Sequence, residues 1–262
     1  MATNWVNVQK VSNENTSGTT VVGTISKPSS GDLLVVGGDA SAVGTPTTLT
    51  ISDNSSGGAS WTAFSGAPFS NSGNTSLTGG WWKIANATDA ANLTAITLTQ
   101  NGTVSIRINT ITVEEYSVTG GGTIGIDLVG HSGSASPVST ISFSPASGSA
   151  QSTNTDELAW AFVAAPGASS MGAPTGTNTF TGTSSAAAFN NGATTNENYI
   201  LSRYVGGVQA SATAGTNVWK LTWTTAENCD SVGATFYYTA VAPSYLPTPR
   251  CSNVSVMRAA TR

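Results

Sequence analysis

Apolar and polar residues alternate along most of this chain, with the period of two that is typical of half-buried β-strands. The pattern is clear in TVSIRI, where Val104, Ile106 and Ile108 fall on one face. Other alternating segments are DELAWAF, NVWKLTW and ATFYYTAV. Segments dense in Gly, Asn, Asp and Ser separate them and predict turns. The pattern therefore predicts an all-β fold, an antiparallel β-sandwich.

Two segments depart from simple alternation. The run GDLLVVGG, residues 31–38, is continuously apolar in its middle and predicts a strand that is covered on both sides. The segment ANATDAANL, residues 85–93, is long enough for one or two helical turns.

The apolar phase also changes within residues 103–116. The apolar positions are even-numbered up to Ile108 and odd-numbered at Ile111 and Val113. A straight strand cannot bury both sets on one face, so we expect a β-bulge near Asn109–Thr110.

Composition narrows the class of protein. Only 8% of the 262 residues are charged, whereas 39% are hydrophobic, which is enough for a large core. Low charge with abundant Ser, Thr and Gly is associated with virion proteins, adhesins and secreted β-proteins. The formal net charge is −4, and all 13 acidic residues precede residue 243. An acidic body argues against nucleic-acid binding, and no apolar run is long enough for a membrane span.

The first residues, MATNWVNVQK, lack the basic and apolar regions of a secretion signal. We expect a virion protein that is made in the host cytoplasm and released by lysis. The alternative is an extracellular protein in its mature form.

No residue pattern indicates an enzyme. His131 is the single histidine, and the G-x-S-x-G nucleophile motif is absent. Glu114 and Glu115 are adjacent, so on a strand they point to opposite faces and cannot form a glycosidase pair. Asp53 and Asn54 favour a side-chain-capped turn over a calcium loop. We therefore expect no catalytic residues, no cofactor and no metal ion.

Trp81 and Trp82 are adjacent, so one faces inward on a strand and the other can face outward. An exposed Trp could stack on a sugar of a host-surface glycan, or contact a neighbouring subunit, where Trp is favoured. The third alternative is that loops cover both rings.

The last 20 residues, 243–262, differ from the body. They contain three prolines, three arginines and no acidic residue. Val254 and Val256 alternate with polar residues and predict a short strand, flanked by Arg250 and Arg258. We interpret 1–242 as the β-sandwich domain and 243–262 as an extended arm that docks on another subunit by strand addition. The alternative is a frayed terminus.

Cys229 and Cys251 are the two cysteines. A disulfide between them would tie the arm to the body. The alternative is two separate thiols in a protein assembled in a reducing cytoplasm.

The order of several short motifs resembles a β-sandwich, jelly-roll-like module of phage structural proteins and bacterial surface proteins. The motifs are GDLLVVGG, DNSSGGASWTAF, GGWWKIANATD, ITVEEYSVTG, IDLVGHSG, DELAWAFVA, WKLTWTT and SVGATFYY, over roughly residues 25–240. EYSV stands here where the module usually has EYSG. The resemblance implies a non-enzymatic virion subunit (capsid decoration, head-fibre or tail-associated) whose partners are other virion subunits or copies of itself. The alternative is a carbohydrate-binding or adhesive module.

Overall fold

The computed structural model describes residues 5–15, 18–42, 48–64, 66–70, 76–101, 106–143, 157–166, 175–176, 180–185, 200–203, 205–209 and 219–240. These residues form three antiparallel β-sheets and one short helix, which confirms the predicted all-β, antiparallel class. The segment 243–262 lies outside the described residues.

The central sheet has the strand order β1-β9-β3-β7-β5, with β6 also paired to β7. Its strands are β1 (Trp5–Asn15), β3 (Leu33–Ala42), β5 (Thr62–Ala63), β6 (Phe69–Ser70), β7 (Ser76–Ile84) and β9 (Ile106–Val118). The sheet thus pairs β1 with β9, although these two strands are far apart in the sequence.

A second sheet, here called the C-terminal sheet, has the order β10-β16-β11-β15-β13. In it, β12 also pairs with β16 and β14 with β11. Its strands are β10 (Gly122–Phe143), β11 (Glu157–Pro166), β12 (Thr175–Gly176), β13 (Phe180–Ser185), β14 (Ile200–Arg203), β15 (Val205–Gln209) and β16 (Trp219–Ala240).

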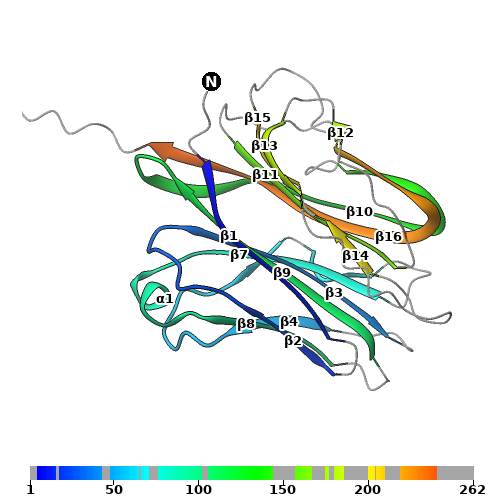
Figure 1. Ribbon diagram of the computed structural model, residues 1–262, viewed down its shortest axis with the longest axis horizontal. Coiled ribbons are helices and arrows are strands. Elements are labelled where there is room, and N and C mark those ends of the chain that lie inside the picture. Colours follow the sequence, from blue (N-terminus) through cyan, green and yellow to red (C-terminus); the bar gives the residue numbers. More distant parts are fainter. Residues whose placement is uncertain are drawn as a thin grey trace, which may run out of the picture.

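The third, three-stranded sheet has the order β2-β8-β4. It consists of β2 (Thr20–Thr24), β4 (Leu49–Asp53) and β8 (Ala95–Gln100), with helix α1 (Ala87–Asn92) before β8. Figure 1 shows the C-terminal sheet at the top, the central sheet in the middle, and the three-stranded sheet with α1 at the bottom.

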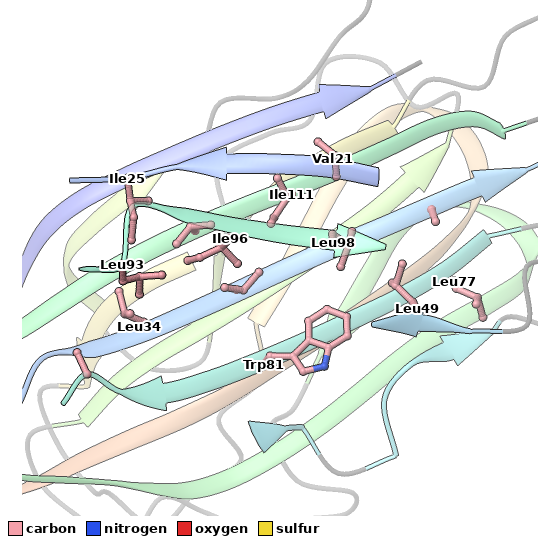
Figure 2. Packing of buried hydrophobic residues seen from close by; sticks show 14 residues of the cluster. Val21, Ile25, Leu34, Leu49, Leu77, Trp81, Leu93, Ile96, Leu98 and Ile111 are labelled. Atoms are coloured by element: carbon pink, nitrogen blue, oxygen red, sulfur yellow. The ribbon is translucent and has the colours of Figure 1, made fainter. Parts of the chain in front are cut away.

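Two hydrophobic cores separate these layers. Core 1 lies between the central and C-terminal sheets and includes Leu33, Val35, Trp160, Phe162 and Phe236. Core 2 lies between the central and three-stranded sheets (Figure 2). Its members include Val21, Leu34, Val36, Trp81, Leu93, Ile96, Leu98 and Ile111.

Strand β3 contributes alternate residues to the two cores. Leu33 and Val35 face core 1, whereas Leu34 and Val36 face core 2, and none of the four is exposed. This confirms the prediction that the apolar run 31–38 is covered on both sides.

The phase change in β9 has a different position from the one predicted. In the pairing of β3 with β9, Ser41 is opposite Ile108 and Ala42 is opposite Ile106, so Arg107 is the extra residue. Asn109 and Thr110 continue the regular register. The bulge therefore precedes the predicted site and lies near the start of β9.

Side-chain amides of β1 cover the edge of the three-stranded sheet. Gln9 forms two 2.8 Å hydrogen bonds with the backbone of Ser26, one from Nε2 to the carbonyl and one accepted from the amide. Asn13 Nδ2 donates to the carbonyl of Val22 at 2.8 Å. These bonds occupy backbone groups that an edge strand would otherwise offer to another chain.

Candidate functional site

The most concentrated polar chemistry lies around Lys83, near the end of β7. Because side chains alternate along a strand, Lys83 shares the inner face of Trp81 and points toward core 2. Its side chain is 0% exposed, and its Nζ lies 2.7 Å from Asp53 Oδ2 and 2.7 Å from Asp89 Oδ1. A lysine is thus held between two carboxylates inside the protein.

Asp53 comes from the end of β4, where it caps a turn. Its Oδ1 accepts hydrogen bonds from the Ser55 amide at 2.9 Å and lies 2.7 Å from Ser55 Oγ. Its Oδ2 accepts from the indole Nε1 of Trp61 at 2.7 Å. The ring of Trp61 also lies beneath Lys83, whose Nζ is 4.7 Å from the ring centroid. The predicted side-chain-capped turn at residues 53–54 is confirmed at Asp53.

Asp89 comes from the first turn of α1, which is confirmed as the short helix expected in residues 85–93. Asn86 caps the helix by accepting from the Asp89 amide, and Asp89 Oδ2 accepts from the Asn86 amide, a reciprocal capping box. Asp89 also accepts from the Ala59 amide at 3.0 Å and from Ser55 Oγ at 2.7 Å. The cap therefore aims this carboxylate at Lys83.

The resting site is ionic. Burial by itself would raise the pKa of both carboxyl groups. Hydrogen bonds from Lys83, from Ser55 and from backbone amides outweigh burial, so the pKa of Asp53 falls below its usual value and that of Asp89 falls to about 2. Two carboxylates and one ammonium therefore carry a net negative charge in the interior.

A second carboxyl pair lies where β3 begins. Burial, together with the hydrogen bond and charge of Glu115, raises the pKa of Asp32 to about 7. Glu115 accepts from Gln9 Nε2 and from the Ser29 amide. A hollow of about 260 Å³ adjoins Asp32, lined by Ser30, Gly31, Asp32, Val118, Gly121, Gly122 and Ile124. Asp32 therefore holds a proton at pH values below about 7.

Glu114 points to the other face of β9, as expected from its position beside Glu115. Its Oε2 accepts from Tyr116 Oη at 2.7 Å and from Trp160 Nε1 at 3.0 Å, inside core 1. The predicted separation of the two adjacent glutamates is therefore confirmed.

The structure places the two predicted tryptophans on opposite faces of β7. Trp81 is 5% exposed and belongs to core 2. Trp82 is half-buried on core 1 and meets Phe236 edge-on, with ring centroids 5.8 Å apart. A role of either ring in binding a partner stays a prediction.

Cys229 is buried on β16, and burial, with the nearby charge of Asp230, raises the pKa of its thiol to about 12. Its predicted disulfide partner Cys251 lies outside the described residues. The same holds for the other predicted partner-binding residues, Arg250, Val254, Val256 and Arg258. These predictions remain open.

Sequence reasoning missed the site around Lys83. Two local signals were available: the lysine follows a core tryptophan by two positions, and Asn86 with Asp89 has the spacing of a capping box. The meeting of Asp53 with Lys83 has no local signal, because it depends on how two sheets pack.

The described ranges contain no group of three or more His, Cys, Asp or Glu side chains suited to a metal ion. In the same ranges, no helix has the length and apolar character that crossing a membrane requires. No family model matches the chain, and no curated protein or solved structure is significantly similar to it.

Proposed function

We propose that this chain is a non-enzymatic structural subunit of a phage virion: a capsid decoration, head-fibre or tail-associated protein that acts by subunit packing and surface display. The jelly-roll-like connectivity and the docking arm, residues 243–262, are parts of this proposal. Its partners would be other virion subunits or copies of itself.

The observation that carries the proposal is the position of the charged side chains. The chain has 9 basic and 13 acidic residues, and seven of those that lie in the described ranges are buried. They are Asp32, Asp39, Lys83, Asp89, Glu114, Glu115 and Asp230. Because these charged side chains lie inside the protein, few charges remain for its surface. Closely packed copies would therefore meet little electrostatic repulsion and a small cost of desolvating charged groups.

One feature of the sheet edges supports the same proposal. The amides of Gln9 and Asn13 cover the edge that β2 offers, which limits unspecific strand pairing. Addition of a strand from an arm would then have to use another edge, and specificity would follow from that restriction.

The alternative glycan-binding role gains no support from Trp81, because that ring forms part of core 2. Among the two predicted tryptophans it would depend on Trp82, which is half-buried. We therefore advance the structural role alone.

Two measurements test the proposal. Mass spectrometry of purified particles of the encoding phage should detect the chain as a stoichiometric component, and its absence would overturn the virion assignment. Light scattering should find an oligomer for the full chain and a monomer for a chain ending at Ala242. An unchanged oligomer after truncation would refute the arm as the docking element.

A further inference from the structure

Lys83 contacts both Asp53 and Asp89 in a largely buried site, where the side-chain exposures of the three residues are 0%, 8% and 0%. Lys83 belongs to the central sheet and Asp53 to the three-stranded sheet. We propose that the amine of Lys83 and the carboxyl group of Asp53 condense to an amide bond between these two layers, with Asp89 as the catalytic base. This inference does not depend on the proposed function.

The first requirement of such a reaction is proximity. The Nζ atom of Lys83 lies 2.7 Å from Asp53 Oδ2. Each residue is held in a strand that pairs with a neighbouring strand of its sheet. Holding two reactants in contact in this way corresponds to an effective concentration of about 10⁵–10⁸ M in well-oriented cases. To form the bond, Lys83 Nζ has to move only from its contact with Asp53 Oδ2 to the adjoining Cγ atom.

The second requirement is a path for protons. Asp89 Oδ1 lies 2.7 Å from Lys83 Nζ and can take a proton from it, which leaves a neutral, nucleophilic amine. Ser55 Oγ lies 2.7 Å from Asp89 Oδ1 and 2.7 Å from Asp53 Oδ1. Its hydroxyl can therefore relay a proton from Asp89 to Asp53 Oδ1.

The third requirement is stabilisation of charge at the attacked carboxyl group. When Nζ bonds to Cγ, negative charge develops on Asp53 Oδ2, and the indole N–H of Trp61 already donates to that oxygen at 2.7 Å. Preorganised donors of this kind are a large part of how enzymes stabilise tetrahedral intermediates.

The reaction balances without another reagent. The N–C bond forms between Nζ and Cγ, and the bond between Cγ and Oδ1 breaks. Two of the three protons of the ammonium leave with Oδ1 as one water molecule, and the third stays on the amide nitrogen. Asp89 ends in the carboxylate form in which it began.

Burial favours the product. A buried ion pair carries a desolvation cost that a neutral amide avoids. The carboxylate of Asp89 remains charged, but it keeps its hydrogen bonds from the amides of Ala59 and Asn86. The water molecule that forms leaves the site, so it is not held beside the new amide bond.

The test is the intact mass of the full chain, purified and then incubated at neutral pH. We expect a mass lower than the sequence mass by one water molecule. Trypsin does not cut before Pro28, so an unmodified chain yields the peptide 11–83. The cross-linked chain instead yields 11–107, lighter by one water, because the modified Lys83 resists cleavage. A chain at its full sequence mass that releases 11–83 would overturn the proposal.

Four variants, one of them a control, assign the atoms. Lys27→Met changes an exposed lysine and should keep the loss of water, whereas Lys83→Met should abolish it. Asp89→Asn, checked for folding by circular dichroism, should retain its sequence mass. A water loss that persists in Asp89→Asn would overturn the role of Asp89 as the base. A water loss that persists in Asp53→Asn would place the bond elsewhere. If a variant does not fold, the wild-type mass and peptides still decide whether the bond exists.

Discussion

Trp160 on β11 donates a 3.0 Å hydrogen bond from its indole nitrogen to Glu114 on β9, and neither residue is exposed. The bond crosses core 1 and joins the C-terminal sheet to the central sheet. Glu114 also accepts from the hydroxyl of Tyr116 at 2.7 Å. A buried carboxyl group with such partners is costly to disturb, because a lost donor leaves it incompletely solvated.

Replacing Trp160 by Phe should therefore destabilise the protein by more than the loss of ring area alone. We expect about 1–3 kcal/mol from the missing donor, in addition to the packing loss. Urea unfolding of Trp160→Phe and of Trp82→Phe gives the comparison, because Trp82 packs on the same core. Equal losses in the two variants would contradict a contribution from the bond to Glu114.

Asp39 should make stability fall as pH rises. Burial is the main cause that raises its pKa to about 8, the charge of Asp230 adds to it, and a hydrogen bond from Thr78 at 2.7 Å opposes it. Between the ordinary value of 3.8 and about 8, the folded state keeps a proton that the unfolded state releases. The stabilisation is complete below pH 3.8 and is lost as pH rises through 8.

The check is the free energy of unfolding of wild type and Asp39→Asn from pH 4 to 9. A single group contributes at most about 1.4 kcal/mol per pH unit to the slope. We expect the asparagine variant to have a shallower decline, and parallel curves would contradict the prediction.

Asp32 should act in the same direction over a narrower range. Burial and the neighbouring Glu115 raise its pKa to about 7, so the stability that it contributes is lost between the ordinary pKa of 3.8 and about 7. The difference in melting temperature between Asp32→Asn and wild type should grow over this interval and stay constant at higher pH. A difference that did not change between pH 4 and pH 7 would contradict the prediction.

Gly37 should not tolerate a side chain. A Cβ atom built on it would lie 2.5 Å from the ring of Phe162, so Gly37→Ala should overpack core 1 and cost about 1–3 kcal/mol. Phe162→Leu alone should also be destabilising, because it opens a cavity. The double variant should lose less than the sum of the two, as measured by chemical denaturation. Strict additivity would show that the two sites do not compete for one space.

The amide cover of the three-stranded sheet should be visible in hydrogen exchange. Gln9→Ala removes the acceptor of the Ser26 amide, which is bonded at 2.8 Å. We expect faster exchange at Ser26, with little change at Leu98, which lies on the middle strand β8. Unchanged protection of Ser26 would mean that its amide is shielded by other means.

The sequence predicted individual strands better than their assembly. Alternation shows which residues share a face, and the apolar run 31–38 correctly indicated a strand with two covered faces. Alternation does not show which sheet covers a face, so the three layers were not predicted. The site around Lys83 was missed for the same reason: its carboxylates come from β4 and α1, 30 and 6 residues away along the chain.

The double burial of β3 has a consequence for how the fold is specified. A strand with one solvent-exposed face has a single acceptable register, because a slip by one residue would expose its apolar side chains. In Leu33–Val36 both faces are apolar, so hydrophobicity alone would accept the slipped pairing. Asp39 does distinguish the two, because one register sets it against the hydroxyl of Thr78 and the other moves it into an apolar layer. Buried polar residues of the central sheet, such as Asp39, therefore favour the observed strand register over the slipped one.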